Sequence, residues 1–109
     1  MSRAATRQPP RPSLDEIMGT LRAQLPELRQ RYGVRTLGVF GSYVRGEQGR
    51  RSDLDLLVEF EQDAKPGLFG FLELQEELGD LLGVKVDLVM KSALKPGIGQ
   101  RILVEVVPV

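Results

Sequence analysis

The 109-residue sequence contains no cysteine and no histidine. Without cysteine there can be no disulfide, no thiolate nucleophile and no cysteine-ligated zinc. Without histidine, a Ser-His-Asp triad, a histidine general base and a histidine-ligated metal are excluded as well. An enzyme built from this chain would accept protons on carboxylates. Any metal it binds would be held by oxygen ligands, which favours Mg²⁺, Mn²⁺ or Ca²⁺.

The sequence also lacks an excess of charge of either sign, with fifteen basic and fifteen acidic residues. Domains that hold nucleic acid through bulk electrostatics are usually basic, so nucleic-acid recognition is not indicated. Long apolar runs are missing too: none approaches the ~20 residues needed to span a bilayer, and no signal-peptide pattern begins the chain. We therefore expect a cytoplasmic protein without a membrane partner.

Residues 1–12 differ from the rest of the chain in composition. They contain three prolines, three arginines and no acidic residue, and we expect them to form a disordered tail. A transit peptide has a similar Arg-rich character but is normally longer. The remaining residues, 13–109, have the length of a single domain.

Helical periodicity is clear at the start of this domain. Ser13 and Glu16 have the spacing of a capping box, in which each side chain satisfies a backbone N–H at the beginning of a helix. Apolar residues then recur at helical spacing as far as Leu28. Pro26 interrupts this stripe and predicts a kink or a restart, and Gly33 predicts the end of the helix.

The remaining elements follow from shorter patterns. Strands are predicted at 36–40, 54–60 and 84–90, and helices at 68–82 and from Pro96 to about Glu105. Residues 41–51 are predicted to be a loop with room for one short helical turn, and the last six residues could form a terminal strand. This order predicts an α/β (α+β) fold, a small mixed sheet with helices packed mainly on one face. The other face would be partly open, and a site would lie there.

Asp53 and Asp55 stand two residues apart at the start of a predicted strand. Because strand side chains alternate, both carboxylates point to the same face. Paired carboxylates repel each other unless a divalent cation neutralises them. Taken alone, an Asp-x-Asp is more often a solvated strand end, so the two residues need support from elsewhere in the chain.

Gly41-Ser42 and Asp87 supply that support. Glycine allows a tight turn and a close backbone approach, and serine offers a hydroxyl and an N–H to phosphate oxygens. Asp87 lies on the less apolar face of another predicted strand. If the strands are neighbours, Asp87 joins Asp53 and Asp55 in a two-metal phosphoryl-transfer site. The alternative is an acidic residue on an exposed sheet face.

The spacing is more specific than its parts. Gly-Ser is followed by ten residues and then Asp-x-Asp. At roughly 5–7% per residue type, chance produces this pattern on the order of 10⁻³ times over the chain. The pattern also falls in the order strand, glycine turn, loop and strand.

With this pattern the chain resembles the minimal nucleotidyltransferase (MNT) family of the polymerase-β-like superfamily. Val44 stands where the family usually has alanine, and Asp87 in Val-Asp-Leu-Val matches the third family carboxylate. The resemblance covers roughly residues 13–105. Its specific part has the family form Gly-Ser-x-Ala-Arg-Gly…Ser-Asp-x-Asp and is carried by Gly41, Ser42, Arg45, Gly46, Ser52, Asp53 and Asp55.

The resemblance implies a nucleotidyltransferase-like fold and a Mg²⁺-dependent transfer of a nucleoside monophosphate. Asp53, Asp55 and Asp87 would hold two Mg²⁺ ions, and Gly41 and Ser42 would bind the phosphates of the donor, expected to be ATP. AMP would pass to a hydroxyl acceptor and pyrophosphate would leave. Asp87 would also help to deprotonate the acceptor.

Arg45 is assigned to the nucleotide-binding residues with two roles left open. It could contact the phosphates or the acceptor, or it could pair with a nearby carboxylate and hold the loop. Arg50 and Arg51 are interpreted as solvated loop charges, although they could steer an anionic nucleotide.

The resemblance also implies a protein partner. Family members are often paired with a helical HEPN-type protein, and they act as antitoxins that modify or bind it. A non-catalytic antitoxin that only binds this partner is the alternative, and the intact carboxylates count against it. P-loop and dinucleotide fingerprints are absent, and a plain structural domain would make the motif a coincidence. The Leu-rich helices could also support a homodimer.

Overall fold

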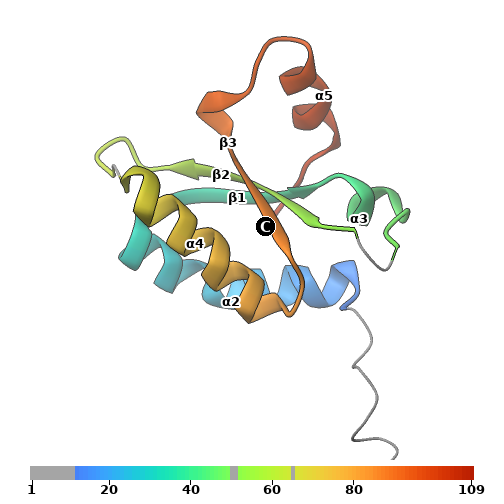
Figure 1. Cartoon of the computed structure of the whole chain (residues 1–109), viewed down its shortest axis with the longest axis horizontal. Helices are drawn as coiled ribbons and strands as arrows, with labels where there is room; N and C mark the ends of the chain where they lie inside the picture. The colour runs from blue at the N-terminus through green and yellow to red at the C-terminus, as the bar shows by residue number, and fades with distance from the viewer. Residues whose placement is uncertain (1–11, 50–51, 65) are drawn as a thin grey trace, which may run out of the picture.

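A computed structural model gives the fold of the chain and describes residues 12–49, 52–64 and 66–109 (Figure 1). The expected tail, residues 1–12, therefore lies outside the described part except for Pro12. None of the helices in these three ranges is long and apolar enough to cross a membrane.

The first helix, α2 (Leu14–Tyr32), has the two ends predicted from the sequence. The Ser13 hydroxyl accepts a hydrogen bond from the Glu16 N–H at 3.2 Å, and the Glu16 carboxylate accepts one from the Ser13 N–H at 2.8 Å. Gly33 ends the helix with φ 74°, and its N–H donates to the Arg29 carbonyl. This left-handed conformation costs glycine little, since it has no Cβ.

Helix α2 continues through Pro26, so the predicted restart is wrong. Proline removes one backbone donor, whose helical acceptor would be the carbonyl of Arg22. Leu21 and Leu28, on either side of the proline, are almost fully buried, at 0% and 1% exposure. Burial on both sides fixes the two halves of the helix against the core and offsets the missing hydrogen bond.

The sheet has four strands in the order β3-β2-β1-β4. They are β1 (Val34–Phe40), β2 (Leu54–Phe60), β3 (Val86–Met90) and the short β4 (Val107–Pro108). Strands β2 and β3 are parallel, whereas β1 is antiparallel to both β2 and β4. The predicted mixed sheet is confirmed. The strand predicted at 36–40 starts two residues earlier than expected, and the one at 84–90 starts two residues later.

Helix α4 (Gly67–Leu82) connects the parallel strands β2 and β3 and packs beside α2. Both helices lie on the same side of the sheet (Figure 1). Along β2, the residues Leu54, Leu56 and Val58 are fully buried and belong to the core with side chains of both helices. Asp55 alternates with them, so it points to the opposite face of the sheet.

The C-terminal segment lies on that opposite side of the sheet (Figure 1). It contains a short 3₁₀ helix, η1 (Lys91–Ala93), which was not predicted, and helix α5 (Ile98–Glu105). The helix was expected to begin at Pro96, which instead lies in a turn. A helix to about Glu105 and a strand in the last six residues were both expected, and each is found in part. Helix α5 stops at Glu105, and strand β4 follows it.

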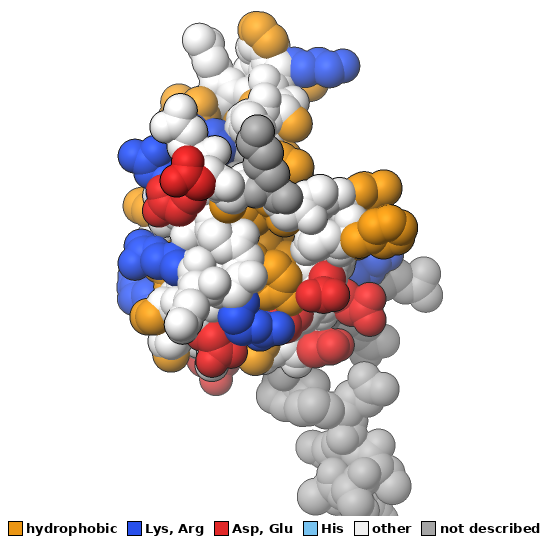
Figure 2. Space-filling view, turned by 90° about the vertical axis from the view of Figure 1, so that its left-hand side faces the viewer, with side chains coloured by type: hydrophobic (Ala, Val, Ile, Leu, Met, Phe, Trp, Pro, Cys, Tyr) orange, Lys and Arg blue, Asp and Glu red, His pale blue; other side chains and the backbone are white. Residues whose placement is uncertain are grey.

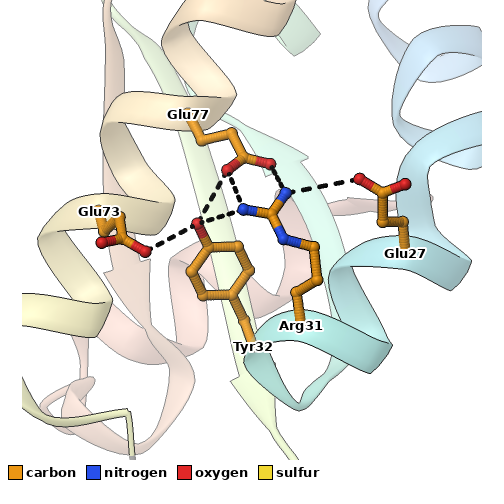
Figure 3. Close-up of polar contacts among 5 residues, drawn as sticks. All are labelled: Glu27, Arg31, Tyr32, Glu73 and Glu77. Carbon is orange, nitrogen blue, oxygen red and sulfur yellow. Dashed lines mark hydrogen bonds and ion pairs between the residues drawn. The ribbon is translucent and has the colours of Figure 1, made fainter.

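A polar cluster joins the end of α2 to α4 (Figure 3). Arg31 donates to both oxygens of Glu77, at 2.6 and 2.8 Å, and the Tyr32 hydroxyl donates to the same carboxylate at 2.9 Å. Burial and then Glu77 raise the pKa of Tyr32 to about 12. Glu27 and Glu73 complete the cluster. It fixes the two helices that form one side of the core.

Candidate active site

The strand register places two of the predicted carboxylates side by side. Asp55 of β2 pairs with Asp87 of β3 on one side and with Phe40 of β1 on the other. Neighbouring strands lie about 4.8 Å apart, and paired residues share a face. Asp55 and Asp87 therefore project from the sheet face that α2 and α4 leave uncovered. The conditional prediction that these two strands are neighbours is confirmed.

Asp53 lies one residue before β2 and is half-buried, as is Asp55, while Asp87 is exposed. Burial raises the pKa of Asp55, and the negative charges of Asp87 and then Asp53 raise it further. Each of these causes disfavours the ionised form of Asp55. Asp53 and Asp87 thus both lie close enough to Asp55 to act on it electrostatically.

The same three carboxylates are not already gathered around a common point. Across ranges 12–49, 52–64 and 66–109, no group of three or more acidic side chains is arranged closely enough to hold a metal ion. Their donor atoms, however, are all carboxylate oxygens, which are the ligands of hard divalent cations. A cation would also relieve the repulsion that raises the pKa of Asp55. In donor type and in position on the sheet, the residues fit a divalent ion.

Gly41 brings the backbone of β1 against Asp55. Its φ of 83° and ψ of −153° are accessible almost only to glycine. A Cβ at this position would overlap Asp55 Oδ2 and lie 2.9 Å from Asp55 Cγ. Glycine is therefore required at this turn for two reasons, as predicted. Its backbone conformation is strained for other residues, and a side chain would overlap a candidate metal ligand.

The short helix α3 (Ser42–Arg45) begins directly after Gly41. The Gly41 carbonyl accepts hydrogen bonds from the N–H groups of Val44 and Arg45, at 3.0 and 3.2 Å. Ser42 is half-buried at the first position of this helix. The predicted short helical turn in the loop is confirmed, and it fixes Ser42 next to the glycine that contacts Asp55.

Arg45 forms ion pairs with two carboxylates. Its Nε lies 2.8 Å from Glu47, and its Nη1 lies 2.6 Å from Glu105 Oε1. These pairs favour the second role left open for Arg45, in which it holds the loop. Arg50 and Arg51 lie outside the described residues.

Glu105 is the residue of this site that sequence reasoning missed. Its second oxygen, Oε2, accepts a hydrogen bond from the Gly41 N–H at 2.8 Å. Glu105 is 64 residues from Gly41 in sequence, and only the pairing of β4 with β1 brings the two together. A two-residue strand has no periodicity, so the sequence offered no usable signal for this contact.

The loop before Asp53 is closed by a short local contact. The Gly49 N–H donates to the Ser52 hydroxyl at 2.8 Å, and the Ser52 N–H donates to the Gly49 carbonyl at 3.2 Å. Serine is suited to such turns because its hydroxyl can bond to nearby backbone. Ser52 of the motif therefore closes a turn two residues before β2 begins at Leu54.

A cavity of about 990 Å³ lies at the other end of the parallel strands. It is lined by the ends of β2 and β3 and the start of α4, including Phe60, Phe71 and Met90. Figure 2 shows hydrophobic side chains at the floor of a hollow on this face, between charged groups. Asp53, Asp55 and Asp87 do not line this cavity, so a search for the site by cavity size would not have found them.

The arrangement of sheet, Gly-Ser turn and strand-borne aspartates is that of a nucleotidyltransferase domain. The family model described as "Nucleotidyltransferase domain" matches residues 21–108. The chain is 57% identical over 95 residues to the protein adenylyltransferase MntA of Thermococcus cleftensis, covering 87% of this chain and 94% of the relative. It is 46% identical over 83 residues to a provisionally named protein adenylyltransferase of Methanocaldococcus jannaschii, covering 76% and 83% of the two chains.

Solved structures agree with these sequence relatives. One, provisionally named a minimal nucleotidyltransferase, superposes with a TM-score of 0.74 at 38% identity and covers 90% of this chain and 97% of its own. A crystal structure of a toxin–antitoxin with AMP-PNP superposes with a TM-score of 0.62 at 26% identity, covering 86% and 69%. The chain therefore belongs to the nucleotidyltransferase domain family, and the predicted fold and enzyme class are confirmed.

Proposed function

We propose that this nucleotidyltransferase moves AMP from ATP to a hydroxyl group on a protein partner, in a Mg²⁺-dependent reaction. The single observation that carries the proposal is the direct pairing of Asp55 with Asp87 on neighbouring strands, next to the Gly41 turn. The adenylyltransferase relatives support AMP as the transferred group, and the AMP-PNP complex supports an adenine nucleotide.

Asp53, Asp55 and Asp87 are the residues proposed to hold two Mg²⁺ ions. When bound, the ions would neutralise the triphosphate and polarise the reacting phosphoryl group. The pairing of Asp55 with Asp87, and the position of Asp53 one residue before β2, support this assignment, and rotation of the three side chains is proposed to complete the site. Repulsion between the carboxylates opposes that rotation until a cation is present. Because the same ions are proposed to bind the triphosphate, metal and nucleotide should bind cooperatively.

The protein residues have few further tasks in this reaction. Ser42 and the Gly41-Ser42 backbone are proposed to bind the β- and γ-phosphates. Asp87 accepts the proton of the acceptor hydroxyl as the new bond from oxygen to the α-phosphorus forms. The bond between the α-phosphorus and its bridging oxygen breaks, and pyrophosphate leaves. Positioning and charge neutralisation supply most of the rate enhancement, which suits a chain without histidine.

A HEPN-type toxin is the proposed partner, with this chain as its antitoxin. The toxin–antitoxin structure at 26% identity supports a toxin as the partner, and the HEPN type follows from the family resemblance. We therefore propose that the partner itself presents the acceptor hydroxyl, most simply a tyrosine or serine near the open edge of the sheet.

Transfer can be tested with α-labelled ATP. The protein would be incubated with Mg²⁺, the labelled nucleotide and lysate of the source organism, and label would be followed on a protein band. We expect label that disappears with EDTA and in the Asp53→Ala and Asp55→Ala variants. Asp80→Ala, at an exposed position on α4, is the matched control and should transfer normally.

Two results would count against the proposal in different ways. Absence of both transfer and metal-dependent ATP binding in the unmutated protein would remove the enzymatic function and leave a binding antitoxin. Equal labelling by the Asp53→Ala/Asp55→Ala double variant would show that transfer occurs but that these carboxylates do not hold the metal.

A further inference from the structure

We propose that Glu105, the last residue of α5, is a positioning residue that holds the Gly41-Ser42 turn in the conformation that the phosphates of the nucleotide require. The proposal rests on the nucleotidyl transfer proposed above. It adds a C-terminal residue to a site whose other members all lie between Gly41 and Asp87. Glu105 is assigned no direct contact with nucleotide or metal.

The position of Glu105 is related to the pairing of β1 with the edge strand β4. Val39 of β1 pairs with Val107 of β4 in antiparallel register. Gly41 lies two residues after Val39, and Glu105 lies two residues before Val107, at the last position of α5. The backbone ladder has ended at this point, and the Glu105 carboxylate takes the place of a backbone acceptor for the Gly41 N–H. The end of α5, held in place by the pairing of β4 with β1, thus brings a side chain to the start of the phosphate turn.

One carboxylate spans both ends of α3. Glu105 Oε2 accepts from the Gly41 N–H at 2.8 Å, and Oε1 lies 2.6 Å from Arg45 Nη1. Gly41 precedes the helix and Arg45 is its last residue, so Ser42 is held between two fixed points. The Gly41 N–H, and then Arg45, hold the pKa of Glu105 below its usual range, which is consistent with an ionised acceptor at both contacts.

The contacts of Glu105 with Gly41 and Arg45, called the tether below, also fix the distance between the turn and the aspartates. Gly41 packs directly on the carboxylate of Asp55, with no room for a Cβ. A turn free to move would either press on Asp55 or open a gap between the phosphate turn and the metal ligands. Because Glu105 holds the Gly41 N–H, it keeps the phosphate turn at a constant distance from the metal ligands.

Glu47 provides a matched control for this argument. It pairs with the same guanidinium, at 2.8 Å from Arg45 Nε, but it does not reach Gly41. Its side chain is 64% exposed, against 23% for Glu105. Replacing Glu47 therefore changes the charge balance at Arg45 and leaves the anchor of the turn in place.

The tether itself can be tested without any activity. Amide hydrogen exchange of Gly41 would be measured by NMR in the unmutated protein and in the variants Glu105→Ala, Glu105→Gln and Glu47→Gln. We expect Gly41 exchange to rise about tenfold or more in Glu105→Ala, because its acceptor is lost. Glu105→Gln keeps one acceptor oxygen and should stay within about threefold of the unmutated protein, as should Glu47→Gln. Unchanged exchange in a folded Glu105→Ala protein would overturn the tether.

The consequence for the reaction is tested with Mg²⁺-ATP on the same proteins. A supporting residue of this kind typically changes affinity or activity by about 10- to 100-fold. We expect Glu105→Ala to raise the KM and Kd for ATP by about tenfold, with a smaller change in kcat, and Glu105→Gln to restore much of the loss. Tighter ATP binding by Glu105→Ala would instead show that Glu105 competes with phosphate. An equal loss in Glu47→Gln would assign the effect to the charge of Arg45.

The two proposals fail in distinguishable ways. If the unmutated protein binds no Mg²⁺-ATP, the proposed function and the positioning role both fail, even where Gly41 exchange confirms the contact. If the unmutated protein binds ATP and Glu105→Ala binds it equally well, the function stands and the positioning role is overturned.

Discussion

Asp55 carries an electrostatic cost in the folded protein. Burial, Asp87 and Asp53 all raise its pKa, so the folded state disfavours its ionised form. A carboxyl group with a raised pKa contributes stability below its unfolded value, near 3.8, and loses it as the pH rises through the folded value. The cost therefore grows as the pH rises from 3.8 towards neutrality. Such a cost is typical of residues kept for function rather than for stability.

Replacing Asp55 with asparagine should therefore separate stability from metal binding. In EDTA at pH 7 we expect Asp55→Asn to melt at a higher temperature than the unmutated protein. The variant lacks the carboxylate charge that burial and the neighbouring aspartates disfavour. Adding Mg²⁺ and ATP should raise the Tm of the unmutated protein but not that of the variant. Thermal denaturation followed by circular dichroism measures both. A lower Tm for Asp55→Asn in EDTA would contradict the assigned environment of Asp55.

Gly41 is the second residue whose identity follows from the site. Gly41→Ala should destabilise the protein by about 1–3 kcal/mol, since φ 83° and ψ −153° are strained for alanine, and the new Cβ would overlap Asp55. Chemical denaturation measures the loss, and ATP binding should fall with it.

Two other glycines of the same loop are controls for Gly41. Gly46 has φ 71° but open space around it, so Gly46→Ala should cost only the backbone strain, about 1 kcal/mol. Gly49 has neither restriction, and Gly49→Ala should stay within about 0.5 kcal/mol. If all three variants lose equal stability, contact with Asp55 is not what requires glycine at position 41.

At the residue scale, local spacing in the sequence identified most of the residues of the candidate site. Asp53, Asp55 and Gly41 lie in one stretch of the chain whose pattern specifies both turn and strand. Asp87 required an assumption about strand neighbours, which the register confirmed. Glu105 could not be predicted, because its contact with Gly41 depends on the position of a two-residue strand at the far end of the chain.

At the scale of elements, the connection β2–α4–β3 builds the site. Helix α4 returns the chain so that β3 lies parallel to β2, and both strands begin at the same edge of the sheet. Asp55 and Asp87 are each the second residue of their strands, so a parallel pairing brings them together. The Gln75 side chain of α4 also accepts from the Leu88 N–H at 2.9 Å and ties the helix to the edge strand β3.

The contact between α2 and α4 gives a pH-dependent prediction. Arg31, and to a smaller extent Tyr32, hold the pKa of Glu77 below its usual value of 4.5. A carboxylate with a lowered pKa contributes stability above the unfolded value, and this is lost as the pH falls through the folded value. Glu77→Gln should therefore lower the Tm at pH 7, with the difference from the unmutated protein shrinking once the pH falls below 4.5.

Glu76→Gln is the control for this variant, because Glu76 is an exposed neighbour on the same helix. It should leave the Tm close to that of the unmutated protein across the same pH range. A Tm difference for Glu77→Gln that persists unchanged at pH 3 would mean that packing of the side chain, rather than its charge, joins the two helices.

Periodicity predicted the long elements and failed at the short ones. Helices α2 and α4 were predicted because their apolar faces repeat over several turns. A kink or a restart was expected at Pro26, and the restart did not occur, since buried leucines on both sides hold α2 together. The 3₁₀ helix η1 and strand β4 have two or three residues each, which is too few for any repeat to show.

At the scale of the whole molecule, the two faces of the sheet have different roles. One face is covered by α2 and α4 and contains the core, whereas the other carries the aspartates and is crossed by the C-terminal segment (Figure 1). The fold class could be predicted because α/β alternation with so few elements leaves one sheet face short of helices. The strand order could not, because a possible strand in the last six residues does not reveal its neighbour, and the place of β4 beside β1 depends on tertiary packing.

The central claim is that the aspartates form a metal-dependent nucleotide site, and isothermal titration calorimetry of ATP tests it most directly. The unmutated protein, the Asp53→Asn/Asp55→Asn double variant and the surface control Asp80→Asn would each be titrated with and without Mg²⁺. We predict ATP binding that requires Mg²⁺, is retained in Asp80→Asn and is lost in the double variant. Binding of equal strength in the double variant, or binding of the unmutated protein that ignores Mg²⁺, would contradict the account.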